Sequence, residues 1–221
     1  MNPRPLLLGH RGARGRKYGV PDNTVAAFDL ALEHGCDGIE FDVRLTSDGC
    51  ALLCHDRMFR SLRLSANPAA RFKELPHLEE ILARYSSRAF LDIELKVPGL
   101  ESRLLTALRH DPPACGYVVS SFLPQVLVSL RAHMKSVPLG IICKTRRQLS
   151  RWPHLPVDYV IVHKTLIAPK LASEIRAAGK QLFVWTVNRR ETIGRLAQWG
   201  VDGIISDKPD VVAAALRNSH N

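Results

Sequence analysis

The sequence contains no run of apolar residues long enough to cross a membrane. A membrane-spanning helix needs about 18 such residues or more, and the apolar runs here are much shorter. Residues 1–8 show neither the length nor the cleavage pattern of a signal peptide, because the polar stretch Gly9-His10-Arg11-Gly12 follows at once. We therefore expect a cytoplasmic protein without stable membrane insertion.

Cysteine is scarce and shows no binding pattern. The chain has five cysteines in 221 residues and no CxxC pair, which argues against a disulfide-rich or redox-active protein. Cys50 and Cys54 lie four residues apart, but no second pair completes a zinc site. We expect these thiols to be buried and inert.

Aromatic residues are also few, at 6% of the chain, and no nucleic-acid-binding motif is present. Against 21 acidic residues there are 31 lysines and arginines, a formal net charge of +10 that attracts anions. Because the basic residues are scattered, a solvated basic surface is the default interpretation, and electrostatic steering of an anionic substrate is the functional one. We expect no nucleic-acid partner. The sequence leaves the oligomeric state open.

Short apolar strands alternate with amphipathic helices along the chain. The expected strands cover residues 5–9, 38–43, 90–97, 117–120, 139–143, 159–162, 182–185 and 203–206, with a further apolar stretch at 51–54. The expected helices follow at 25–32, 78–83, 100–110, 124–134, 146–152, 169–178, 191–199 and 210–217. Eight such units predict an α/β protein with a closed (β/α)8 TIM barrel, a single domain spanning residues 1–221. An open doubly wound sheet is the alternative, but no glycine-rich nucleotide fingerprint follows the first strand.

Two of the strands carry acidic residues on one face. Glu40 and Asp42 alternate with apolar Ile39, Phe41 and Val43, and a later strand repeats the pattern. In that later strand the polar face holds Asp92, Glu94 and Lys96. Such faces fit either two half-exposed strands or inward-facing ligands of a hard cation, Mg²⁺ or Ca²⁺.

In a (β/α)8 barrel the active site lies at the carboxyl ends of the strands. The polar residues at those ends include His10, Arg11, His55, Lys96 and Trp185. Histidines titrate near neutral pH and can remove one proton and deliver another. A divalent ion beside two cationic side chains would stabilise the charge of a phosphoryl group. The rim therefore predicts phosphoryl-transfer chemistry.

A family resemblance is carried by several short motifs. They are Gly9-His10-Arg11-Gly12, Asn23-Thr24, Gly38-Ile39-Glu40-Phe41-Asp42-Val43, His55-Asp56, Glu94-Leu95-Lys96, Trp185-Thr186-Val187-Asn188 and Gly203-Ile204-Ile205-Ser206-Asp207-Lys208-Pro209. In this order they resemble the glycerophosphodiester phosphodiesterases, from residue 9 to about residue 210. The resemblance implies a metal-dependent (β/α)8 barrel that hydrolyses glycerophosphodiesters to glycerol 3-phosphate and an alcohol.

The resemblance also implies roles for particular residues. His10 and His55 would be the catalytic acid/base pair, and Glu40, Asp42 and Glu94 would bind the divalent cation. Arg11 and Lys96 would hold the phosphate, and Trp185 would offer an apolar wall to the glycerol.

Two departures from the family pattern bear on the substrate. Asp22 stands where the family usually has glutamate, and only residues 57–76 occupy the place of a larger insertion after the second strand unit. The arginines of this shortened insertion (Arg57, Arg60, Arg63 and Arg71) predict an open mouth that tolerates bulky or anionic head groups.

Two other functions compete with this interpretation. One is a related lipid phosphodiesterase of the phospholipase C or sphingomyelinase D type. The sequence shows no apolar or aromatic membrane-docking segment to favour it. The other is a catalytically inactive barrel that binds phosphodiesters, which is disfavoured because both histidines and all three carboxylates are intact.

Overall fold

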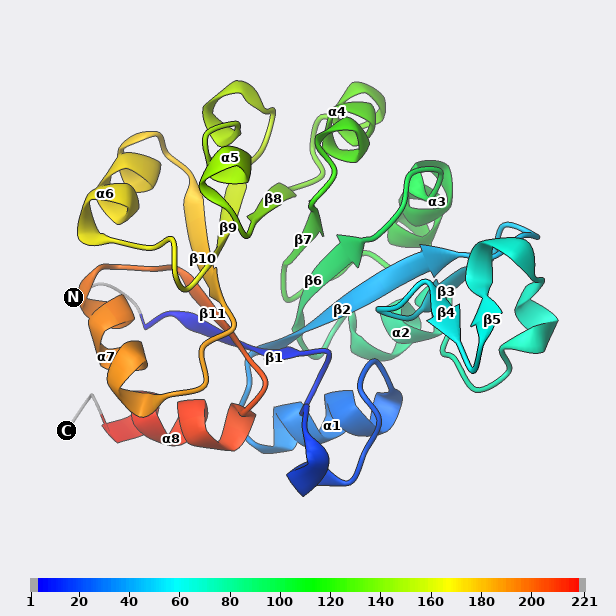
Figure 1. Ribbon diagram of the computed structural model, residues 1–221, viewed down its shortest axis with the longest axis horizontal. Coiled ribbons are helices and arrows are strands. Elements are labelled where there is room, and N and C mark those ends of the chain that lie inside the picture. Colours follow the sequence, from blue (N-terminus) through cyan, green and yellow to red (C-terminus); the bar gives the residue numbers. More distant parts are fainter. Residues whose placement is uncertain (1–3, 219–221) are drawn as a thin grey trace.

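The computed structural model describes residues 4–218 and shows a ring of parallel strands surrounded by helices (Figure 1). The barrel strands are β1 (Leu6–His10), β2 (Gly38–Leu45), β6 (Phe90–Leu95), β7 (Tyr117–Ser121), β8 (Leu139–Cys143), β9 (Tyr159–His163), β10 (Gln181–Trp185) and β11 (Gly203–Ser206). The helices are α1 (Val25–Glu33), α2 (Leu78–Tyr85), α3 (Glu101–His110), α4 (Pro124–His133), α5 (Arg146–Leu149), α6 (Pro169–Ala177), α7 (Arg190–Gln198) and α8 (Pro209–Asn218).

The sheet closes on itself because β1 pairs in parallel with both β11 and β2. Every other neighbouring pair in the ring is parallel as well. The predicted (β/α)8 barrel is confirmed, and the open doubly wound alternative is wrong. In the described part of the chain, no helix is long and apolar enough to cross a membrane.

Two apolar layers hold the barrel together. Outside the ring, Ile39, Phe41 and Val43 pack against the helices, and the rings of Phe28 and Phe41 lie 5.8 Å apart. Inside the ring, the second layer consists of Leu8, Phe90, Val118, Ile142, Ile161, Phe183 and Ile205. At the level of this layer Gly38 has no room for a side chain, since a Cβ there would lie 2.2 Å from the Phe90 carbonyl oxygen. The outward packing predicted for Ile39, Phe41 and Val43 is confirmed, so Glu40 and Asp42 face inward.

The apolar stretch at 51–54 is not a barrel strand. It forms β3 (Ala51–Leu53), which runs antiparallel to the end of β2 with Val43 opposite Leu53. Because β2 extends beyond the ring and β3 returns along it, His55, two residues after β3, is brought back to the barrel rim. The shortened insertion comes next and contains the hairpin of β4 (Met58–Phe59) and β5 (Leu62–Arg63).

Candidate active site

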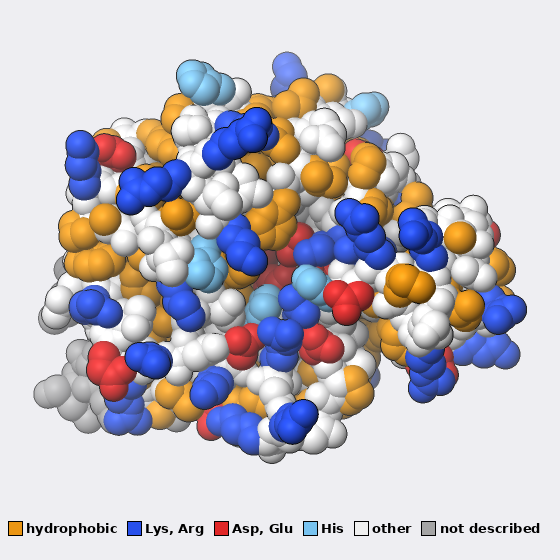
Figure 2. Space-filling view, in the orientation of Figure 1, with side chains coloured by type: hydrophobic (Ala, Val, Ile, Leu, Met, Phe, Trp, Pro, Cys, Tyr) orange, Lys and Arg blue, Asp and Glu red, His pale blue; other side chains and the backbone are white. Residues whose placement is uncertain are grey.

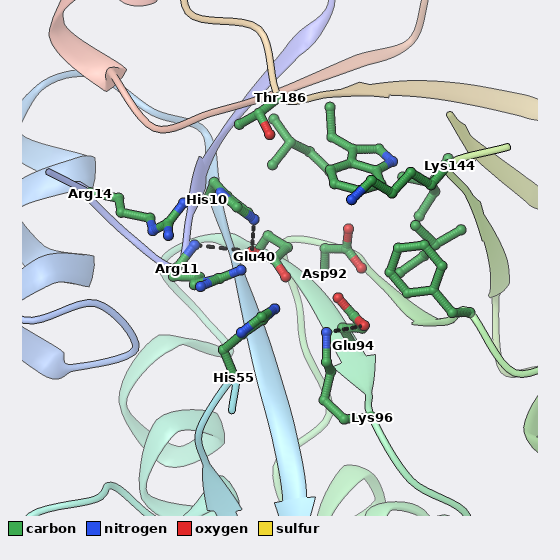
Figure 3. Close-up of a pocket in the computed structure, with 15 residues that line it drawn as sticks. His10, Arg11, Arg14, Glu40, His55, Asp92, Glu94, Lys96, Lys144 and Thr186 are labelled. Atoms are coloured by element: carbon green, nitrogen blue, oxygen red, sulfur yellow. Dashed lines mark hydrogen bonds and ion pairs between the residues drawn. The ribbon is translucent and has the colours of Figure 1, made fainter. Parts of the chain in front are cut away.

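A pocket of about 390 Å³ opens at the carboxyl ends of the barrel strands. Its polar walls are His10, Arg11, Arg14, Glu40, His55, Asp92, Glu94, Lys96, Lys144 and Thr186 (Figure 3). In Figure 2 acidic side chains lie deep in this hollow and basic ones surround its mouth. Of the eight residues predicted to act in catalysis, cation binding or substrate binding, only Asp42 is absent from the pocket wall, and it is buried beside Glu94.

Three buried carboxylates meet on one side of the pocket. One oxygen from each of Glu40, Asp42 and Glu94 lies within 4.8 Å of the others. The sheet register produces this cluster, because β2 and β6 pair with Glu40 opposite Asp92 and Asp42 opposite Glu94. A donor set made only of oxygen suits a hard divalent cation better than zinc.

Without a cation, the charged form of this cluster is electrostatically unfavourable. Burial, together with repulsion from Asp42 and Glu94, raises the pKa of Glu40 well above its usual range. Burial also raises the pKa of Glu94, to about 7. For Asp42 the burial effect is outweighed by Lys96 and Arg11, which lower its pKa. Two of the three carboxylates therefore favour a bound proton, which a cation can replace.

The residues present fit a divalent cation. The Lys96 ammonium lies 2.6 Å from Glu94 Oε1 and 3.2 Å from Asp42 Oδ1, but neither oxygen accepts a hydrogen bond of good geometry. Buried carboxylate oxygens without such a bond are costly, and a hard cation is the group that satisfies them.

His10 is oriented by residues from the far end of the chain. Its Nδ1 lies 2.7 Å from Asp207 Oδ1, and Asn188 donates a hydrogen bond to the other Asp207 oxygen at 2.8 Å. Against the effect of burial, the bond to His10 lowers the pKa of Asp207, so this carboxylate stays ionised. An ionised acceptor at Nδ1 places the proton there, and Nε2 then faces Glu40 Oε2 at 3.9 Å.

We expect Asp207→Asn to lower kcat by about 10²–10⁴-fold, because loss of the carboxylate that orients a catalytic histidine removes most of its acid–base contribution. The amide keeps the shape of the side chain but no longer stabilises a proton on His10. The pH–rate profile is the diagnostic measurement, since a purely structural role for Asp207 would leave its shape unchanged. Lys17→Gln on the same face is the control, and equal losses in both variants would contradict the assignment.

His55 approaches the same pocket from the end of β3. Its Nδ1 lies 2.8 Å from Asp56 Oδ1, and its backbone carbonyl accepts a hydrogen bond from Arg44 Nε at 2.8 Å. Burial lowers the pKa of His55, and the nearby Arg11 adds to the effect. The structure thus brings both predicted histidines to one cavity; their catalytic roles stay a prediction.

Arg11 lies between the pocket and the loop after β1. Its Nε is 3.1 Å from Asp42 Oδ2, and its Nη1 is 3.2 Å from Asp22 Oδ2. Asp22, the departure from the family pattern, therefore contacts arginines and not the carboxylate cluster. Its neighbour Asn23 supports the cluster instead, by donating a hydrogen bond to Asp42 Oδ2 at 2.9 Å.

Trp185 forms part of the opposite wall. Its ring packs edge-on against Phe122 at 5.7 Å and His163 at 5.1 Å. The indole Nε1 is buried and has no hydrogen-bond partner among the described residues. The Lys96 ammonium lies 5.6 Å from the Phe122 ring centre, so two of the three predicted substrate-binding residues, Lys96 and Trp185, lie against the same aromatic side chain.

Three further charged residues line the pocket. The sequence pattern places Asp92 on the acidic face but gives it no role in the site. Asp92 is 1% exposed and accepts a hydrogen bond from Ser120 Oγ at 2.6 Å, and burial raises its pKa to about 7. Arg14 and Lys144 also line the pocket, but no motif marks them.

A barrel with buried carboxylates and two histidines at the carboxyl ends of its strands defines an enzyme of the TIM-barrel class. A sequence profile of the glycerophosphoryl diester phosphodiesterase family matches residues 10–104 and 113–211. The chain therefore belongs to this family, and the resemblance drawn from the motifs is confirmed.

Individual relatives agree with this assignment. The Bacillus subtilis protein YhdW is 30% identical over 93% of this chain and 96% of its own length. A glycerophosphodiester phosphodiesterase of Caldanaerobacter subterraneus subsp. tengcongensis is 29% identical over 96% of this chain and 98% of its own. The structure of an Oleispira antarctica phosphodiesterase in complex with its product sn-glycerol-3-phosphate superposes with a TM-score of 0.85 at 26% identity, covering 97% of each chain.

Proposed function

We propose that this enzyme hydrolyses glycerophosphodiesters to glycerol 3-phosphate and an alcohol, using a divalent cation and the two histidines. One observation carries the proposal: the cluster of Glu40, Asp42 and Glu94 adjoins the pocket into which His10 and His55 both project. The glycerol 3-phosphate bound to the Oleispira antarctica relative supports the choice of substrate.

In this proposal Glu40, Asp42 and Glu94 hold the cation, which when bound polarises a phosphoryl oxygen. Mg²⁺ and Ca²⁺ both accept such oxygen ligands. Arg11 and Lys96 neutralise the remaining negative charge of the phosphodiester. Both are surrounded by carboxylates that keep them charged, since Asp42 and Glu94 raise the pKa of Lys96 despite its burial.

The histidines carry the two protons of the reaction. One imidazole takes the proton from the attacking nucleophile, and the other delivers a proton to the oxygen of the departing alcohol. Asp207 holds His10 in the tautomer that presents Nε2 to the pocket. Trp185 and Phe122 supply an apolar wall for the carbon atoms of the glycerol.

Release of glycerol 3-phosphate from purified enzyme tests the proposal directly. We expect release from glycerophosphocholine, glycerophosphoethanolamine or glycerophosphoglycerol when Mg²⁺ or Ca²⁺ is present. The measurement is a coupled glycerol 3-phosphate dehydrogenase assay. Absence of release from all three diesters with either cation would overturn the proposed function.

A further inference from the structure

A second pocket, of about 430 Å³, lies beside the active site. Its polar walls include Arg44, Arg57, Arg63, Lys96 and Gln125. Lys96 also lines the active-site pocket, so the two cavities meet at this side chain. In Figure 2 several basic side chains lie next to the hollow on the side of the shortened insertion.

The three arginines of this pocket form no ion pair with the described residues, and Asp42 and Glu94 act on Arg44 only from a longer distance. In the described part of the chain no carboxylate lies within ion-pair distance of Arg44, Arg57 or Arg63. Elsewhere the insertion does neutralise its charges, as Arg60 does with Glu74 at 2.7 Å. Like charges gathered in one pocket repel, and a bound anion is the direct way to offset that repulsion.

Hydrogen bonds fix the Arg44 side chain and the backbone at Arg57. Arg44 follows Asp42 on the extension of β2, is half-buried, and donates its Nε hydrogen bond to the His55 carbonyl. Arg57 and Arg63 flank the β4–β5 hairpin, where the backbone amide of Leu64 donates to the Arg57 carbonyl at 3.1 Å.

A small apolar cluster joins the insertion that carries the hairpin to the end of β3. Leu64 and Phe72 are each 1% exposed and pack against Leu52 and Cys54 at the end of β3. Asp48 fastens the insertion from the turn before β3 by accepting the backbone N–H of Ala69 at 3.1 Å. These contacts fix the backbone that carries the exposed side chains of Arg57 and Arg63, beside the half-buried Arg44.

We propose that this pocket binds a second phosphate group, carried on the alcohol half of the substrate. The inference rests on the proposed function and extends it to a class of substrate, glycerophosphodiesters whose alcohol ends in a phosphate monoester. Several guanidinium groups around one cavity match the charge and the several acceptor oxygens of such a phosphate.

The position of the pocket selects the alcohol half. Trp185, the proposed wall for the glycerol, ends β10, whereas Arg44 extends from β2, with β1 and β11 between these strands in the ring. Phe122 and Lys96 lie between Trp185 and the arginine pocket, since Phe122 contacts Trp185 and Lys96 lines both cavities. A substrate whose glycerol faces Trp185 directs its other half toward Lys96 and the arginines.

Matched substrates test this inference. Diesters of glycerol 3-phosphate with propanediol, butanediol and hexanediol are compared with the same compounds carrying a terminal phosphate. With wild-type enzyme we expect the terminal phosphate to lower KM by about 10-fold for at least one chain length, since each tenfold step corresponds to about 1.4 kcal/mol. In Arg57→Gln/Arg63→Gln the KM ratio between the two forms falls to about 1.

The control is Arg71→Gln/Lys73→Gln, which removes the same charge from exposed positions of the insertion outside both pockets. It should keep the wild-type KM ratio. Hydrolysis of the plain diesters with no benefit from the terminal phosphate in wild-type enzyme would overturn the inference and leave the proposed function intact.

Calorimetric titration with the phosphorylated diesters gives a second readout that does not depend on turnover. Tighter binding by wild type than by the Arg57/Arg63 variant supports the subsite even if no diester is hydrolysed, a result that would overturn only the proposed function. Equal binding by the two proteins would overturn the subsite.

Discussion

Removal of the divalent cation with EDTA is expected to abolish hydrolysis and to lower the melting temperature by about 5–10 °C. A ligand at about 100 times its Kd stabilises a protein by about 2.7 kcal/mol, and in a chain of this size each kcal/mol shifts Tm by about 2–4 °C. The gain arises because the cation replaces repulsion among Glu40, Asp42 and Glu94 with attraction. Differential scanning fluorimetry with EDTA, Mg²⁺ or Ca²⁺ measures it.

This stabilisation should grow with pH. In the cation-free protein the pKa of Glu40 and that of Glu94 are raised, so the folded state holds protons that the unfolded chain has released. For Glu94 the stability from its proton is present below the unfolded pKa of about 4.5 and is lost as pH rises through about 7. A cation therefore competes with the Glu94 proton at about pH 5.5 and much less at about pH 8.

The cation-dependent Tm shift is therefore expected to be larger at about pH 8 than at about pH 5.5. Glu40→Gln/Glu94→Gln should lose both the shift and its pH dependence. Glu79→Gln/Glu80→Gln, on the outer helix α2, is the matched control and should keep them. An equal shift at both pH values, or none in wild type, would contradict cation binding at the cluster.

Replacement of either active-site histidine by alanine is expected to lower kcat by about 10³-fold. General acid–base catalysis contributes about 10²–10⁴-fold, and the remaining electrostatic stabilisation would persist. His10→Ala should keep the cation-dependent Tm shift, because the three carboxylates are untouched. Steady-state release of glycerol 3-phosphate, measured beside melting curves, separates lost catalysis from lost folding.

The control for this pair is His154→Ala, an exposed histidine outside the pocket. It should retain wild-type kcat. Activity of His10→Ala and His55→Ala within about tenfold of wild type would show that the proton transfers belong to other groups.

The barrel and the carboxylate pair could be predicted because they depend on local periodicity. Strict alternation around Glu40 and Asp42 placed Ile39, Phe41 and Val43 on the outer face, where they pack against the helices. The same rule applied to both acidic strands, although only the pairing register shows that Asp42 lies opposite Glu94. Local pattern specifies the face of a strand, whereas register depends on the whole ring.

Contacts between distant parts of the chain could not be predicted in this way. Asp207 lies 197 residues from His10, so no spacing rule joins them. Arg44 was overlooked because a cation on an alternating strand fits a solvent-facing position. Its location in a pocket depends on the antiparallel pair β2–β3, which returns His55 to the rim.

The arginine rim expected from the sequence was correct only in part. Arg57 and Arg63 line the pocket beside the active site, but Arg60 is neutralised by Glu74 and Arg71 lies outside both pockets. The composition identifies a basic segment. The fold of the β4–β5 hairpin determines which of its charged side chains line the pocket beside the active site.

The shortened insertion shares its small core with Leu52 and Cys54 and lies outside the ring of barrel strands, which makes it an exchangeable module. Residues 57–76 leave the barrel after Asp56 and rejoin it before α2, and their buried side chains pack on β3 and not among the ring strands. Longer or shorter segments grafted between these two points would alter the entrance while the carboxylate cluster stays on β2 and β6. Recombination at this one site is thus a route by which a single barrel acquires new leaving-group preferences.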